Sequence, residues 1–164
     1  MKICFLRHGP AVPRGTKGIS EADRPLTPRG RKKTSRAMRG IRALDLKINA
    51  IYSSPLRRAR ETAEILSKVI KKPGPKTTEH LLPESSPGAL VEFLKKTKAP
   101  VVALVGHEPA MTAALAHFLG TERTGSYELK KAGIALVSVP KWAPRPSATL
   151  ELLLTPAALR AIGR

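Results

Sequence analysis

The sequence predicts a three-layer α/β/α fold, in which a mostly parallel mixed sheet carries helices on both faces. Short apolar runs rich in β-branched residues, at 2–6, 48–52 and 101–105, are separated by stretches with helical periodicity. Two further runs, at 134–139 and 149–154, are separated by a short proline-rich segment. We expect this last pair to form a C-terminal antiparallel hairpin.

The stretches between the strands carry a common start signal. Apolar or small residues in 55–70 recur at helical spacing along one face, and similar patterns follow several prolines. Proline suits the first helical position because its missing N–H would be unpaired there, and a preceding Ser or Thr can cap the helix. We therefore expect helices to begin at Pro28, Pro55, Pro87, Pro109 and Pro156.

Length and composition indicate one globular domain over residues 1–164. Apolar residues make up 41% of the chain, which is enough to bury a core. The single cysteine, Cys4, allows no internal disulfide. No apolar run approaches the roughly 18 residues of a membrane span, and the first one is shorter than the roughly 7–15 of a secretion signal. We therefore expect a cytoplasmic protein that does not associate with a membrane.

The charge is strongly positive, with 30 Lys and Arg against 12 Asp and Glu and a net charge of +18. Such a surface attracts anionic ligands and polyanions. Proteins that bind single-stranded nucleic acid usually add stacking aromatics, but this chain has one Trp, two Tyr and three Phe. We do not expect nucleic acid as the main ligand. A polyanion-binding module is a remote alternative, and an acidic partner protein fits the charge as well.

Chemically active residues follow the predicted strands. Arg7 and His8 come after the first strand, Ser54 and Arg58 after the second, and His107 after the run at 101–105. Parallel sheets bind ligands beyond the carboxyl ends of their strands. Two of these segments also lead into helix N-termini, which favour anions. We therefore expect these side chains to form one anion-binding site.

This residue set suits phosphoryl transfer. An arginine holds phosphate with two parallel hydrogen bonds and keeps its charge. A histidine is a nucleophile at neutral pH because its neutral form is populated. Phosphoryl transfer needs mainly positioning and charge stabilisation. We expect transfer of phosphate to His8 and hydrolysis of the resulting phosphohistidine, with no metal and no other cofactor.

Three motifs carry a resemblance to a known family. The stretch Leu6-Arg7-His8-Gly9 resembles the signature of the histidine phosphatase superfamily, whose fold is described as phosphoglycerate mutase-like. The run from Ser54 to Thr62 resembles its second motif, and Gly106-His107 resembles its third. The stretch Arg24-Pro25-Leu26-Thr27 and the short chain resemble one branch, the SixA-type phosphohistidine phosphatases.

The resemblance implies a role for each matching residue. His8 would be the nucleophile, and Arg7, Arg58 and His107 would bind the phosphoryl group. Arg24 would lie at the rim of the pocket. Ser54 would add a contact, although a helix-capping role also explains it.

The general acid is assigned by position only. Larger members of the family place a Glu after the third strand region, and Glu84 matches that position loosely. A phosphohistidine substrate would need less acid catalysis, because imidazole is a less basic leaving group than an alkoxide.

The sequence therefore predicts a phosphatase whose substrate is a phosphorylated protein or a small phosphorylated molecule. Our main hypothesis is a protein phosphohistidine phosphatase. The alternative is a phosphomonoesterase that uses the same site on small metabolites such as sugar phosphates or nucleotides.

Overall fold

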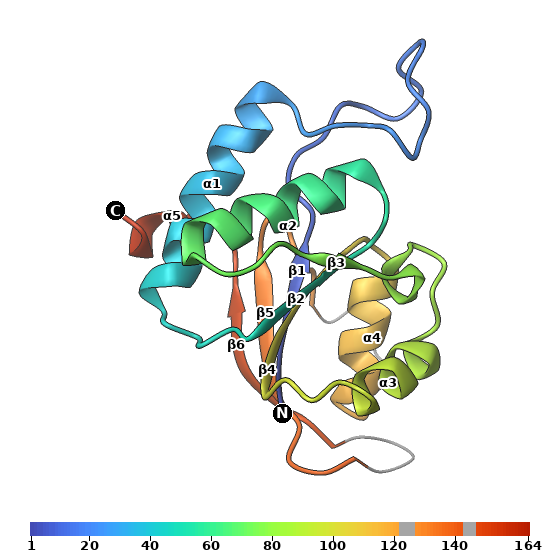
Figure 1. Cartoon of the computed structure of the whole chain (residues 1–164), viewed down its shortest axis with the longest axis vertical. Helices are drawn as coiled ribbons and strands as arrows, with labels where there is room; N and C mark the ends of the chain where they lie inside the picture. The colour runs from blue at the N-terminus through green and yellow to red at the C-terminus, as the bar shows by residue number, and fades with distance from the viewer. Residues whose placement is uncertain (122–126, 143–146) are drawn as a thin grey trace.

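The computed structural model describes residues 1–121, 127–142 and 147–164, and it shows one central sheet between two helical layers (Figure 1). The strands are β1 (Lys2–Arg7), β2 (Ala50–Ser53), β3 (Lys76–Thr77), β4 (Val101–Gly106), β5 (Ile134–Ser138) and β6 (Thr149–Leu154). Within the described residues they form a six-stranded sheet in the order β3-β2-β4-β1-β5-β6. The β1–β4, β2–β4 and β2–β3 pairs are parallel, whereas β5 and β6 run antiparallel to their neighbours. The predicted fold class is confirmed.

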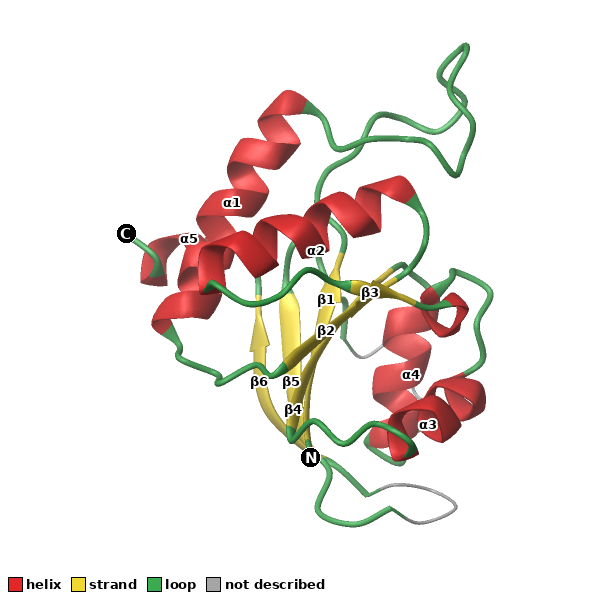
Figure 2. Cartoon of the chain, viewed as in Figure 1, coloured by secondary structure: helices red, strands yellow, loops and turns green. Residues whose placement is uncertain are grey.

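The helices divide between the two faces of the sheet (Figure 2). Helices α1 (Pro28–Ala43), α2 (Arg57–Ile70) and α5 (Pro156–Ile162) pack on one face. Helices α3 (Pro87–Lys95) and α4 (Ala110–Phe118) pack on the other, with a short 3₁₀ helix at Glu79–Leu81 before α3. In the described part of the chain, no helix is both long enough and apolar enough to cross a bilayer.

The central strand β1 shows why its sequence is a continuous apolar run. Ile3 and Phe5 belong to the core under α3 and α4, whereas Cys4 and Leu6 belong to the core under α1, α2 and α5. All four side chains are inaccessible to solvent, because a central parallel strand is covered on both faces. Burial also raises the pKa of the Cys4 thiol to about 12.

Three of the five predicted helix starts are confirmed. Thr27, Ser86 and Thr155 each accept a backbone N–H with their side-chain oxygen, and the following proline opens α1, α3 and α5.

The other two predicted starts are wrong by one or two residues. Helix α2 begins at Arg57 rather than Pro55, because the Ser54 hydroxyl accepts the N–H of Leu56 and holds Pro55 in the preceding turn. Helix α4 begins at Ala110, and Pro109 takes the N-cap position. There the Glu108 carboxylate accepts the N–H of Thr112.

Candidate active site

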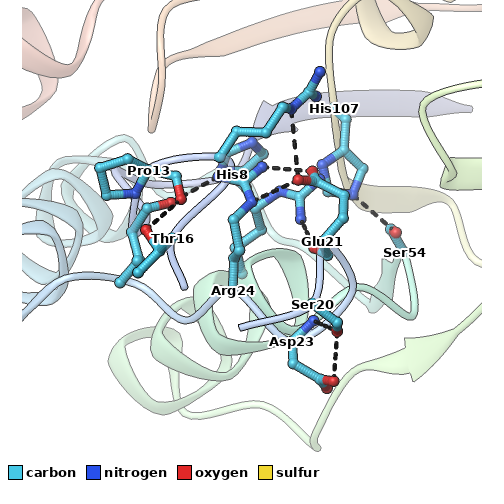
Figure 3. Close-up of polar contacts among 12 residues, drawn as sticks. His8, Pro13, Thr16, Ser20, Glu21, Asp23, Arg24, Ser54 and His107 are labelled. Atoms are coloured by element: carbon cyan, nitrogen blue, oxygen red, sulfur yellow. Dashed lines mark hydrogen bonds and ion pairs between the residues drawn. The ribbon is translucent and has the colours of Figure 1, made fainter. Parts of the chain in front are cut away.

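The carboxyl ends of β1, β2 and β4 bring His8, Ser54 and His107 together. The N–H of His8 donates to Gly106 O at 3.0 Å, and the N–H of Ser54 donates to Val105 O at 2.9 Å. These bonds continue the parallel ladders beyond the strands, so the two histidines emerge side by side. Their ring centroids lie 5.0 Å apart, and Figure 3 shows them next to Arg24 and Glu21.

The His8 imidazole is held in its neutral form with one ring nitrogen free. Its Nδ1 lies 2.7 Å from Gly9 O, and a carbonyl only accepts, so Nδ1 carries the hydrogen and Nε2 keeps the free lone pair. Burial is the main cause that lowers the pKa of His8 to about 3, and the positive charges of Arg58, Arg7 and Lys131 act in the same direction. The hydrogen bond to Gly9 opposes this shift without reversing it. His8 is therefore neutral near pH 7.

His107 is neutral in the free protein as well. Burial, followed by His8 and Arg58, lowers its pKa to about 2. Its Nε2 lies 2.9 Å from the Ser54 hydroxyl, which also accepts the Leu56 N–H. Its Nδ1 is buried and has no partner among the described residues. In the tautomer that carries its hydrogen on Nδ1, this atom can donate to a phosphoryl oxygen.

Two further residues fix the geometry of the His8 loop. The N–H of Gly9 donates to Thr62 Oγ1 at 2.9 Å, and the Thr62 hydroxyl donates to Arg58 O at 2.7 Å. A Cβ on Gly9 would lie 2.1 Å from Thr34 Oγ1 on α1, so only glycine fits at this position. No local pattern in the sequence indicates this role of Thr62, because its partner lies 53 residues away.

The two arginines predicted to bind phosphate, Arg7 and Arg58, and the arginine predicted at the pocket rim, Arg24, are each held by a backbone carbonyl. The acceptors, at 2.7–2.9 Å, are Leu129 O for Arg7, Val12 O for Arg24 and Glu21 O for Arg58. Arg58 is only 2% exposed, and burial is the largest cause that lowers the pKa of its guanidinium. Each of these anchors uses only one N–H group, and the Nε atoms of Arg7 and Arg58 are buried with no partner among the described residues.

Glu21 is a member of the site that the sequence did not reveal. Its carboxylate accepts hydrogen bonds from Arg24 Nε at 2.8 Å and from Arg24 Nη2 at 2.6 Å (Figure 3). The same carboxylate lies 3.0 Å from Arg58 Nη2 and 3.5 Å from Arg14 Nε. The bond to Arg24 is the main cause that lowers the pKa of this carboxyl group. The only available signal was an acidic residue three positions before Arg24 in a chain that has few acids.

Glu84 lies apart from this cluster. It occupies an exposed turn between the 3₁₀ helix and α3, and no contact within the described residues joins it to His8 or His107. Its role as general acid stays a prediction.

A cavity of about 650 Å³ adjoins the cluster at Arg7. Its other lining residues are Glu108, Pro109, Thr112, Ala113, Tyr127 and Glu128. Oε1 of Glu108 is buried and has no partner in the described part of the chain. Glu128 in this lining forms an ion pair with Lys130 and lies 4.0 Å from Arg7 Nη1. Over the ranges described, no three His, Cys, Asp or Glu side chains are placed to hold a metal ion, and a metal-independent reaction stays a prediction.

Solved structures share this architecture. The protein histidine phosphatase SixA, solved in complex with tungstate, superposes with a TM-score of 0.83 at 20% identity, over 97% of this chain and 99% of that one. A phosphoserine phosphatase mutant of Entamoeba histolytica, solved with phosphoserine, gives a TM-score of 0.71 at 16% identity, over 96% and 98% of the two chains. At these identities the similarity establishes the fold.

Sequence comparison establishes the family. An uncharacterised protein of Picosynechococcus sp. is 38% identical over 138 residues, which cover 82% of both chains. The model of the histidine phosphatase superfamily (branch 1) matches residues 3–92, a segment that includes His8, Arg24, Ser54 and Arg58. This chain therefore belongs to the histidine phosphatase superfamily, whose members are phosphatases.

Proposed function

We propose that this chain hydrolyses phosphohistidine on a protein substrate. Nε2 of His8 attacks the phosphorus, the bond from phosphorus to the substrate imidazole nitrogen breaks, and that nitrogen takes up a proton. Water then attacks phospho-His8, releases inorganic phosphate and restores the neutral imidazole. Arg7, Arg58 and His107 would hold the phosphoryl oxygens through both steps.

The observation that carries this proposal is the state of His8. Its tautomer is set by Gly9 O and its neutrality by burial, so a lone pair on Nε2 is available without a separate base. The neighbouring arginines supply the positive charge that a transferring phosphoryl group needs.

The cavity beside Arg7 supports an imidazole as the leaving group. Glu108 lines this cavity, and its unpartnered Oε1 can accept a hydrogen bond from an imidazole or from a peptide N–H group. The similarity in fold to SixA agrees with such a substrate. Cytoplasmic action is part of the same proposal.

The second candidate is a phosphomonoesterase on small metabolites. The similarity in fold to a phosphoserine phosphatase supports it, and the phosphoryl-binding residues would be the same. Only the leaving group distinguishes the two candidates.

Turnover measurements test both candidates. We expect a phosphohistidine peptide to be hydrolysed with a kcat/KM at least about tenfold above those of phosphoserine and sugar phosphates, and His8→Ala to abolish turnover of all of them. The matched control is His117→Ala, which changes a histidine on α4 that lies outside the site. Unchanged turnover in His8→Ala would contradict the mechanism, and a preference for a small ester would favour the second candidate.

The proposal includes an acidic substrate protein, for which the surface offers a docking place. Helix α1 contains no Asp or Glu, and its residues Arg36 and Arg39 line a groove of about 360 Å³ with Arg160, Gly163 and Arg164. Within the described residues, none of these four arginines forms an ion pair with a side-chain carboxylate. Uncompensated guanidinium groups favour carboxylate-rich partners.

A tailed peptide tests this docking surface. From Pro28 to Arg39 the helix rises about 16 Å, so a tail of about 12 extended residues can reach the groove. We expect Arg36→Glu with Arg39→Glu to lower kcat/KM about tenfold for a phosphohistidine peptide with a polyglutamate tail, and little for a polyserine tail. Lys96→Glu with Lys98→Glu is the control of equal charge. Equal losses on both tails would contradict docking in the groove.

A further inference from the structure

The arginines that surround His8 are already bound to an anion, which belongs to the chain itself. Arg24 directs guanidinium N–H groups at the carboxylate of Glu21 (Figure 3). Arg58 does so as well, and Arg14 approaches the same group. Arg58 is one of the residues expected to hold the phosphoryl group, and Arg24 is expected at the rim of its pocket. A carboxylate and a phosphoryl group compete for such donors, because both accept paired N–H bonds in one plane.

The carboxylate is not needed to hold these arginines in place. Arg58 Nη1 donates to the backbone carbonyl of Glu21 at 2.8 Å, and Arg24 Nη1 donates to Val12 O at 2.7 Å. Both guanidinium groups are nearly buried, at 2% and 10% exposure of the side chain. Backbone anchors and packing would therefore keep the cluster in position if the Glu21 side chain turned away.

Glu21 is also free to leave. Its side chain is 44% exposed, in contrast to the arginines that it contacts. The surrounding loop has its own bonds, from Ser20 Oγ to Asp23 Oδ2 at 2.6 Å and from Thr16 Oγ1 to Pro13 O at 2.8 Å. A change of the Glu21 rotamer would thus not require the loop to unfold.

We propose that Glu21 is an intramolecular competitor that occupies the phosphoryl-binding arginines in the free protein and makes the site selective for dianions. A phosphoryl dianion carries two charges and three terminal oxygens, so it displaces the carboxylate. A monoanion carries the same single charge as the Glu21 carboxylate, so it gains nothing by displacing that carboxylate and does not bind. This inference rests on the proposed phosphatase site and adds the residue that sets its affinity and its charge selectivity.

Calorimetric titration with inorganic phosphate at pH 8 tests the proposal. We expect Glu21→Gln and Glu21→Ala to bind phosphate at least about tenfold more tightly than the unmodified chain, because no charge-assisted bond has to be broken first. Asp23→Asn is the matched control: it removes one negative charge from the same loop, but its partner is Ser20 rather than an arginine. We expect it to change the affinity less than about twofold, as an exposed charge screened by salt.

A second titration, with acetate as competitor, measures the selectivity. In Glu21→Ala, acetate should occupy the vacated arginines and weaken phosphate binding, whereas in the unmodified chain it should have little effect. If both Glu21 variants bind phosphate no more tightly than Asp23→Asn does, or more weakly, then Glu21 positions the arginines and the proposal is overturned. Phosphate binding needs no turnover, so a wrong substrate assignment would show only in the peptide comparison.

Discussion

Two arginine-rich regions of this molecule differ in burial and therefore in what they can do. In the active site, Arg58 is 2% exposed, and both Arg58 and Arg24 are anchored to carbonyls and share the carboxylate of Glu21. In the groove between α1 and α5, Arg39 and Arg160 are accessible and lack an acidic partner within the described residues. Arginine side chains are thus held in fixed positions near His8, whereas those in the groove between α1 and α5 are free to change conformation.

The difference follows from the surrounding dielectric. A buried guanidinium interacts strongly with an anion at one position, and its orientation is determined by the fold. An exposed guanidinium is screened by water and salt, so it attracts anions without selecting their shape. We therefore expect chemistry and selectivity from the first region, and partner capture from the second.

The largest effect on activity should appear when one arginine in each region is replaced and the two variants are compared. We expect Arg58→Met to lower kcat on a small phosphorylated substrate by about 10²–10³-fold, since a buried charge donor to the phosphoryl group is lost. Arg39→Met should leave that activity unchanged. Steady-state kinetics with both variants checks this, and thermal melting shows that each is folded. Similar losses in the two variants would contradict the division into site and groove.

An intermediate effect should appear in the dependence of stability on pH. His8 and His107 have pKa values of about 3 and about 2 in the folded chain, against an ordinary 6.5. Between these values the unfolded chain binds protons that the folded chain does not, so the free energy of unfolding falls as the pH drops below 6.5. Each histidine contributes about 1.4 kcal/mol per pH unit in this range.

Urea unfolding between pH 7 and pH 5 measures this slope. His107→Asn should lose the share of the slope that comes from His107, whereas carboxylates contribute equally to both proteins. An unchanged slope would mean that His107 has the same pKa in the folded and the unfolded chain, which would contradict its burial as a neutral group.

The smallest effect on turnover should come from a substitution that pushes helices α1 and α5 apart beneath the groove. A Cβ on Gly40 would lie 2.1 Å from Leu159 O, a backbone atom that cannot rotate away. We expect Gly40→Ala to lower the free energy of unfolding by about 1–3 kcal/mol. It should also reduce the preference in kcat/KM for a polyglutamate tail over a polyserine tail, while turnover of small substrates persists. Gly74→Ala, where a Cβ meets nothing within 4 Å, is the control. A stability loss in the control of the same size would argue against the helix contact.

The sequence was most informative where one local feature implied a position in space. The runs at 2–6 and 101–105 were sufficient to place His8 and His107 on one edge of the sheet, because parallel strands share that edge. Thr27, Ser86 and Thr155 predicted three helix starts for the same reason, since capping is a local interaction. Strand β3 was missed, because its two residues are too few to show a period.

By itself, the sequence determined the order of the elements, the fold class and the residue types at the strand ends, since these depend on periodicity and on neighbours along the chain. Only the tertiary structure decided which atoms meet. Gly9 and Thr62 are 53 residues apart, Arg58 reaches the carbonyl of Glu21 across 37, and the neutrality of both histidines depends on burial by several elements. Such contacts are set by packing, which no local pattern encodes.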